Sequence, residues 1–117
     1  MNPSDLDLLQ KYPAPSFVKH DGDKLPLDLI TPEMINALGG ALKFGADKYA
    51  PRNWEQGAEW GRYYAALQRH LWAFWSGQEV DEESGLPTLH HAACCLMFLI
   101  TYVERGIGED NRKPGKG

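Results

Sequence analysis

The segment TLHHAACCLMFLITYVER, residues 88–105, constrains the fold of this chain more than any other. It lies between Pro87 and Gly106, which predicts a helix that begins near Pro87 and ends at about Arg105. The middle of this helix, from Ala92 to Ile100, is apolar on every side. Because such a helix has no polar face for solvent, we expect it to be buried all round by other helices.

Two further helices are predicted upstream of this segment. Thr31 is a favourable N-cap, Pro32 suits the first helical position, and apolar residues then recur at helical spacing until about Tyr49. The second helix runs roughly from Glu59 to Ser76, with aromatic and aliphatic residues three and four apart. The glycine that follows ends it, and no segment shows a convincing strand pattern.

The fold class that follows is all-α, a helical bundle. Two helices barely cover a third that is apolar all round, so we expect a second copy of the chain to complete the bundle. The protein should therefore be a homo-oligomer, either a dimer or a tetramer. The expected organisation is an extended N-terminal arm at residues 1–30, a helical catalytic domain at 31–106, and a flexible polar tail at 107–117.

Charge and cysteine usage limit the classes of function. The 117-residue chain has a net charge of −4 and lacks the basic footprint of proteins that bind a nucleic-acid backbone. Cys94 and Cys95 are neighbours inside the apolar helix, so they are poor disulfide partners and indicate a reducing compartment. The polar N-terminus does not resemble a signal peptide, and the apolar run is too short for a bilayer. We expect a cytoplasmic protein with no membrane or nucleic-acid partner.

One end of the expected bundle collects acidic residues and histidines. If short loops join antiparallel neighbours, the first helix begins beside the end of the second and the start of the third. The residues that would meet there are Glu33, Asp81, Glu83 and His91, with Lys24 and His70 nearby. Converging carboxylates suit Mg²⁺ or Mn²⁺, so these first four residues are candidate metal ligands. The alternative is a solvated acidic loop, EVDEES, before a buried helix.

The opposite end holds the segment GADKYAPRNWEQG. It offers a cation for phosphates, flat aromatic faces for a base and an amide for the base edge. The candidates for binding substrate are Lys48, Tyr49, Asn53 and Trp54, together with Arg69 of the next helix. The alternative is an interhelical loop anchored by its aromatic residues. The two ends would lie about 25 Å apart, too far for one nucleotide unless oligomer packing joins them.

Three segments together resemble a known family: GDKLPLDLITPE, KFGADKYAPRNWEQG and YYAALQRHLWAFWSGQEVDEESGLPTLHHAACCLMFL. They resemble the phage dATP/dGTP diphosphohydrolases, small MazG-like enzymes, over residues 22 to about 103. The resemblance rests on the combination of KYxxxNW, RHL and DxESG followed by HA.

The resemblance implies an all-α nucleoside-triphosphate pyrophosphohydrolase of the MazG-like type, with two or three Mg²⁺ or Mn²⁺ ions. Its substrate would be a purine deoxynucleoside triphosphate, dGTP with dATP as a further candidate, cut to the monophosphate and pyrophosphate. In a phage that makes 2-aminoadenine, the reaction would supply dGMP for that synthesis.

The usual MazG-like ligands, ExxE on one helix and ExxD on the next, do not transfer by motif. Glu79 and Glu82 have the first spacing but lie in an expected loop, and the last helix holds no ExxD. In the expected mechanism the cations lower the pKa of a bound water, and Glu33 or Glu83 helps to deprotonate it.

Two competing hypotheses stay open at this point. One is a triphosphohydrolase that releases whole triphosphate, with His70, Asp81 and His91 as metal ligands. The other is a helical adaptor or inhibitor without enzymatic activity, in which the acidic residues form a solvated rim. Product analysis separates the two enzymes, since one yields the monophosphate and the other the nucleoside.

Overall fold

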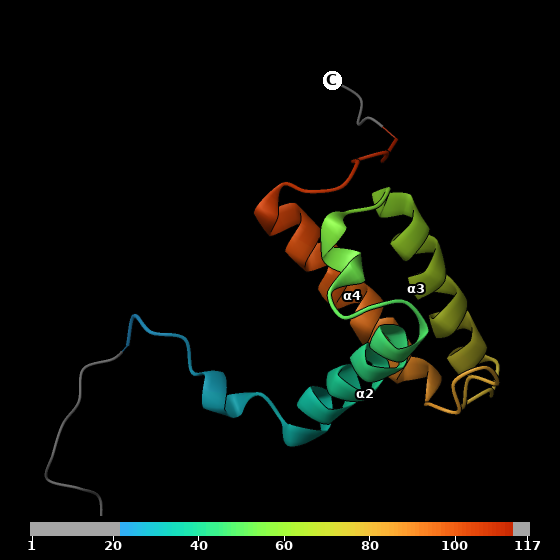
Figure 1. Ribbon diagram of the computed structural model, residues 1–117. Helices are drawn as coiled ribbons and strands as arrows, with labels where there is room; N and C mark the ends of the chain where they lie inside the picture. Colours follow the sequence, from blue (N-terminus) through green and yellow to red (C-terminus); the bar gives the residue numbers. More distant parts are fainter. Residues whose placement is uncertain (1–21, 114–117) are drawn as a thin grey trace, which may run out of the picture.

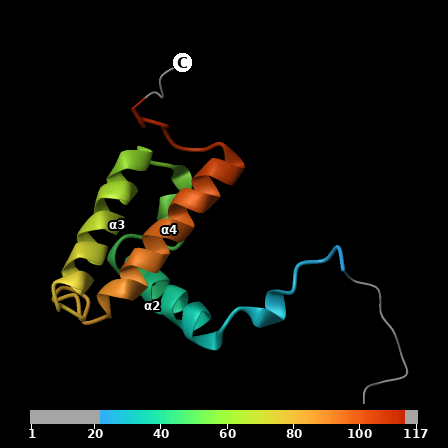
Figure 2. The ribbon, with the colours of Figure 1, turned by 180° about the vertical axis from the view of Figure 1, so that it is seen from behind.

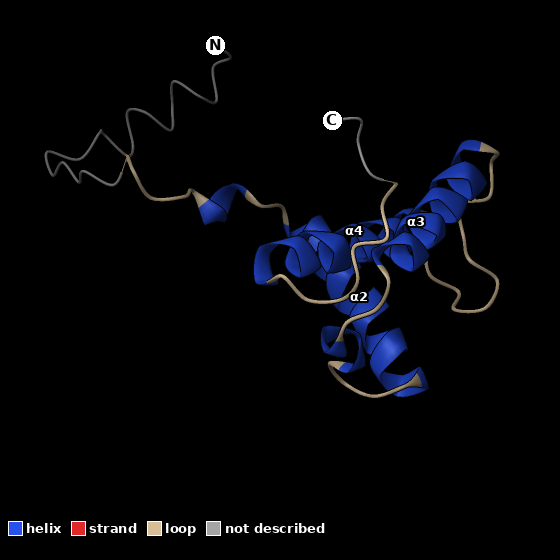
Figure 3. Ribbon diagram, turned by 90° about the horizontal axis from the view of Figure 1, so that it is seen from above, coloured by secondary structure: helices blue, strands red, loops and turns tan. Residues whose placement is uncertain are grey.

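The computed structural model describes residues 22–113, and the regular elements within that range are all helical (Figure 3). Their order is η1 (Leu27–Leu29), α2 (Pro32–Lys48), η2 (Asn53–Gln56), α3 (Trp60–Trp75) and α4 (Thr88–Arg105), where η marks a 3₁₀ helix. The predicted all-α class and the three predicted helices are confirmed. None of the helices in the described range is long and apolar enough to cross a membrane. Most of the predicted arm, and the end of the predicted tail, lie outside the described residues.

Local signals in the sequence account for the helix boundaries. The side chain of Thr31 accepts a hydrogen bond from the Met34 amide at 3.2 Å, and Pro32 occupies the first turn of α2. Gly106 adopts a left-handed conformation, with φ of 64°, and ends α4.

The packing of the helices differs from the predicted up-down-up order. α3 and α4 form an antiparallel hairpin, and α2 packs mainly on α4 (Figure 1). The end of α2, rather than its beginning, lies at the start of α4: the Phe44 and His91 rings meet edge to face at 5.8 Å. The cause is the link between α2 and α3, which is long enough to contain η2 and carries the chain across the hairpin.

Within the described chain, helix α4 is covered on one side only, so its predicted burial on all sides still depends on a second copy. Its inner side is buried at Ala92, Cys94, Cys95 and Tyr102. Its outer side leaves large apolar side chains about half exposed: Leu89 (41%), Leu96 (48%), Ile100 (54%) and Val103 (55%). Since α2 crosses α4 rather than running along it, the outer side has no cover from residues 22–113.

Residues 107–111, the first part of the predicted tail, contact the start of α3. The Trp60 amide donates to the Glu109 carbonyl at 2.9 Å, and the Glu109 amide donates to the Ala58 carbonyl at 3.1 Å. The Trp60 indole donates to the Ile107 carbonyl at 2.9 Å, and the Gly61 amide donates to Asn111 at 2.8 Å. Residues 107–111 therefore clasp the beginning of α3; we call these contacts the C-terminal clasp.

Candidate active site

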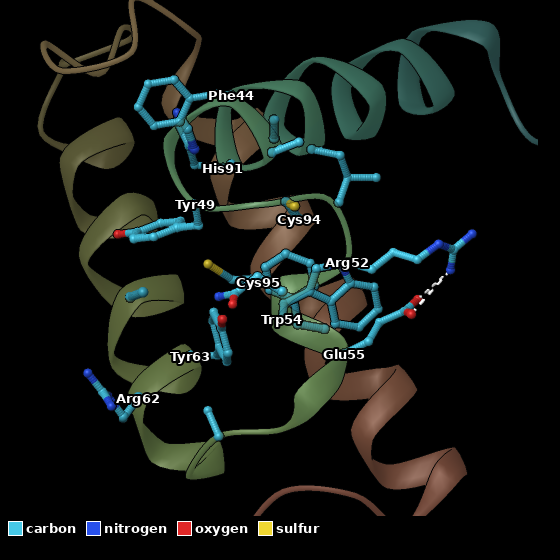
Figure 4. A pocket seen from close by; sticks show the side chains of 18 of the residues that line it. Phe44, Tyr49, Arg52, Trp54, Glu55, Arg62, Tyr63, His91, Cys94 and Cys95 are labelled. Atoms are coloured by element: carbon cyan, nitrogen blue, oxygen red, sulfur yellow. Dashed lines mark hydrogen bonds and ion pairs between the residues drawn. The ribbon is translucent and has the colours of Figure 1, made fainter.

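A cavity of about 860 Å³ lies between α2, the α2–α3 link, α3 and α4 (Figure 4). This volume is within the range of about 300–1,000 Å³ typical of small-molecule sites. Several residues singled out from the sequence line it: Tyr49, Asn53, Trp54, Arg69 and His91. The predicted separation of two clusters at opposite ends of the bundle is therefore wrong, because one cavity joins residues from both.

Aromatic side chains form the inner wall of the cavity. Trp54 stacks on Phe98 with ring centroids 4.4 Å apart, and the Tyr102 hydroxyl donates to the Trp54 carbonyl. Tyr63 packs edge to face against Phe98 at 4.9 Å. One face of Trp54 is thus already occupied, which supports the alternative of an aromatic-anchored link. Tyr49 remains 67% exposed and offers a freer surface for a base.

Arginines of α3 supply positive charge at the cavity. Arg62 and Arg69 both line it, and neither forms an ion pair with any other residue of the described range. They are seven residues apart, which places them on the same face of the helix. Arg52 also lines the cavity but is engaged with Glu55, at 2.9 and 3.2 Å. Arg62 and Arg69 are therefore the cations available to a phosphate.

A polar cluster lies beside the cavity where the α3–α4 loop meets α4. Ser84 Oγ and His91 Nε2 are hydrogen-bonded at 2.6 Å, and the Ser84 amide donates to Asp81 Oδ2 at 2.9 Å. The same Asp81 oxygen is 4.0 Å from His91 Nε2. The His70 ring stacks on His91 with centroids 5.1 Å apart. The loop thus fixes one nitrogen of His91, while Nδ1 has no hydrogen-bond partner among the described residues.

The surroundings shift the proton affinities in this cluster. Burial lowers the pKa of His70, and the neighbouring His91 lowers it further. For Asp81, burial acts to raise the pKa, but hydrogen bonds from Ser84 outweigh it and the pKa is lowered. Near neutral pH the cluster therefore combines an ionised carboxylate with a neutral His70.

Acidification should destabilise the fold through His70. Because its pKa in the fold lies below the ordinary 6.5, the unfolded chain takes up a proton that the folded chain does not. This contribution to the free energy of unfolding is complete above pH 6.5 and is lost as the pH falls through the folded pKa. Urea denaturation from about pH 7.5 to about pH 5.5 should show the loss, with a shallower dependence in His70→Asn. Identical slopes in both proteins would contradict the shift.

The cysteines are part of the cavity wall but are not activated nucleophiles. Both thiols are free and buried. Burial raises the pKa of Cys94 to about 12 and that of Cys95 to about 11, so both stay protonated at neutral pH.

The predicted metal ligands do not assemble within the described chain. Glu83 forms an ion pair with Lys48 at the end of α2, at 2.5 Å. Glu33 lies in the first turn of the same helix, about 22 Å further along its axis. Nε2 of His91 is already engaged by Ser84. Residues 22–113 contain no group of three or more His, Cys, Asp or Glu side chains able to hold a metal ion, so the residues do not fit the expected centre in one copy.

The remaining candidates lie outside the cavity. Lys24 is exposed and lies in the segment before α2. That segment runs away from the α3–α4 hairpin (Figure 1). Lys48 is at the surface, where the carboxylate of Glu83 raises its pKa. Arg62, Tyr63 and Ser84 were not identified from the sequence. The seven-residue spacing of Arg62 and Arg69, which places them on one face of the helix, is the one local signal that could have identified Arg62.

Comparisons with known proteins identify the family. A family profile described as "dATP/dGTP diphosphohydrolase, N-terminal" matches residues 15–112. The dATP/dGTP diphosphohydrolase of Salmonella phage PMBT28 is 33% identical over 96 residues, which are 82% of this chain and 33% of that protein. The chain thus spans about a third of the length of this relative, and no solved structure matches it. The chain belongs to the dATP/dGTP diphosphohydrolase family, through the N-terminal region of that family.

Proposed function

We propose that this chain hydrolyses dGTP or dATP to the nucleoside monophosphate and pyrophosphate. The family supports the reaction class. The observation that carries the assignment is the cavity, which combines an aromatic wall with two arginines that form no ion pair within residues 22–113. Supply of dGMP for 2-aminoadenine synthesis is the role we propose for the product. We further propose that the protein acts as a homo-oligomer in the host cytoplasm.

In the proposed complex, Arg62 and Arg69 bind the triphosphate along α3. Their guanidinium groups would neutralise charge on the phosphate oxygens and on the departing pyrophosphate. The base would lie against Tyr49, with Asn53 at its edge and the occupied ring of Trp54 behind it. At the rim of the cavity, Lys48 would bind a phosphate in place of its present ion-pair partner, Glu83.

We propose that His91 accepts a proton from the attacking water. Its side chain lines the cavity, its Nε2 is held by Ser84, and Nδ1 is the nitrogen left for a water molecule. Asp81 supports the positive charge that develops on the ring, at 4.0 Å. The water then attacks the α-phosphorus, and pyrophosphate departs with its charge held by the arginines.

Dependence on Mg²⁺ or Mn²⁺ remains a separate proposal. Glu33, Asp81, Glu83 and His91 are the expected ligands, but one described chain does not bring them together. Glu33 would have to come from another copy. No step above is therefore assigned to a metal.

A triphosphohydrolase is the second candidate, and one observation favours it. His70, Asp81 and His91 lie together, as that hypothesis requires. However, the two imidazole rings are stacked, so their nitrogens do not converge on a common point in the described structure.

The test is incubation with each of the four dNTPs, with Mn²⁺ and then with EDTA, followed by chromatography. Conversion of dGTP or dATP to the monophosphate, weak for pyrimidines, supports the main proposal. Release of deoxyguanosine favours the second candidate. No turnover would leave a non-enzymatic adaptor. Loss of activity in EDTA supports the metal proposal, and full activity in EDTA removes it.

Replacing Arg62 by alanine should lower kcat/KM for dGTP by about 10²–10³-fold, the cost of losing one preorganised group that stabilises charge. The matched control is Arg112→Ala, because Arg112 is exposed, pairs with Asp110 and lies outside the cavity. Steady-state kinetics on both variants measures the effect. Equal kinetics in the two variants would exclude Arg62 from phosphate binding.

A further inference from the structure

The outer side of α4 carries a regular apolar seam. Leu89, Ala93, Leu96, Ile100 and Val103 follow one another at alternating intervals of four and three residues. This spacing is that of a helix that packs lengthwise on another helix. No charged residue interrupts the seam, and its four large side chains are 41–55% exposed. In Figure 2 α4 lies in front of α2 and α3, with no other described element before it.

We propose that the seam binds the same seam of a second copy, antiparallel, about a two-fold axis at Leu96. The side chains of the seam are complementary in size when the two helices run antiparallel. In this register Leu96 meets its own copy and Leu89 faces Val103, while the small Ala93 lies one residue from the position directly opposite the large Ile100. A parallel pair would instead oppose Ala93 to Ala93 and leave a gap.

Ionisable residues beside the seam also favour the antiparallel direction. His90 and Glu104 both follow directly on a seam residue, at opposite ends of α4. In an antiparallel pair these flanking positions face each other across the interface, so His90 of each copy would meet Glu104 of the other. The helix dipoles are also opposed in this arrangement. A parallel pair provides neither contact.

The seam differs from the other exposed apolar surface on the hairpin. Along α3 the exposed positions Tyr64, Leu71 and Trp75 include a polar residue, Gln68, within the same helical row. The row on α4 has no such interruption, and it is self-complementary only when reversed. These features select a second copy as the occupant.

Sedimentation of the protein over a range of concentrations tests the association without any nucleotide. We expect an oligomer. Ile100→Glu should raise its dissociation constant at least tenfold, so that smaller species predominate at the same concentration. The matched control is Tyr64→Glu on α3, since Tyr64 is 55% exposed and Ile100 is 54% exposed. Circular dichroism of both variants checks that the helices remain. A monomeric wild type, or an oligomer unaffected by Ile100→Glu, overturns the proposal.

Oxidative crosslinking tests the direction. Leu96→Cys should form an intermolecular disulfide, because the two copies of residue 96 meet at the axis. Leu89→Cys should not, since its two copies would lie about 21 Å apart along the helices. The wild type, with its buried cysteines, gives the background. Crosslinking of Leu89→Cys, or none for Leu96→Cys, overturns the antiparallel register. Because neither experiment measures hydrolysis, failure of this proposal is distinguishable from failure of the proposed function.

Discussion

Asp81→Asn is expected to lower kcat for dGTP hydrolysis by about 10³–10⁴-fold while the fold survives. The amide has the same shape and retains an oxygen for the Ser84 amide, which donates at 2.9 Å in the wild type. What it lacks is the negative charge 4.0 Å from His91 Nε2. In enzymes that use a carboxylate to support a catalytic histidine, this change costs about 10⁴-fold. Steady-state kinetics gives the effect, and urea denaturation checks the fold.

Glu82→Gln is the matched control for this prediction. Glu82 is the next residue of the same loop, is exposed, and makes no hydrogen bond or ion pair with another described side chain. The Glu82→Gln variant should hydrolyse dGTP at the wild-type rate. Activity retained in Asp81→Asn would exclude Asp81 from both the proton transfer proposed here and the metal proposal. Equal losses in both variants would show that the loop responds only to its total charge.

The helices could be predicted from the sequence because their signals are local. The cap at Thr31, the proline at position 32 and the stop at Gly106 each act within a few residues, and each is present in the structure. The apolar spacing of α3 and α4 likewise marks the faces that meet in the hairpin. The resemblance to the phage family added the reaction class, which no local pattern contains.

The arrangement of the helices could not be predicted from such signals. The up-down-up assumption requires short links, whereas the link between α2 and α3 forms η2 and crosses the hairpin. The decisive contacts join residues far apart in sequence, such as Tyr102 to Trp54 and Lys48 to Glu83. Each contact depends on the packing of all three helices, whereas the up-down-up order predicts Glu33 near the acidic loop and the aromatic segment far from it.

The C-terminal clasp could not be predicted either, because its composition is that of a loop. GIGEDNRKPGKG is polar and rich in glycine, which favours a mobile tail. Its backbone nevertheless pairs with the start of α3, and Ala58 and Gly57 of the adjoining segment line the cavity. The clasp therefore supports the wall of the site from outside.

Gly108→Ala is expected to lower the free energy of unfolding by about 3–5 kcal/mol, a large share of the 5–15 kcal/mol typical of a domain. Gly108 has a φ of 80°, where a side chain costs about 1–2 kcal/mol. An added Cβ would also lie 2.5 Å from the Ala58 carbonyl oxygen, which is backbone and cannot turn aside. The clasp would have to open, with loss of its hydrogen bonds at about 0.5–1.5 kcal/mol each.

Gly106→Ala is the control that separates backbone strain from the contact. Gly106 also has a positive φ, 64°, but an added Cβ would meet nothing within 4 Å. Gly106→Ala should lower the free energy of unfolding only by the cost of the left-handed backbone conformation, about 1–2 kcal/mol. The difference between the two variants, measured by urea denaturation, is then the contribution of the clasp. Since Ala58 and Gly57 line the cavity, Gly108→Ala should also weaken dGTP hydrolysis more than Gly106→Ala does. Equal destabilisation in the two variants would show that residues 107–111 contribute nothing to the stability of the fold.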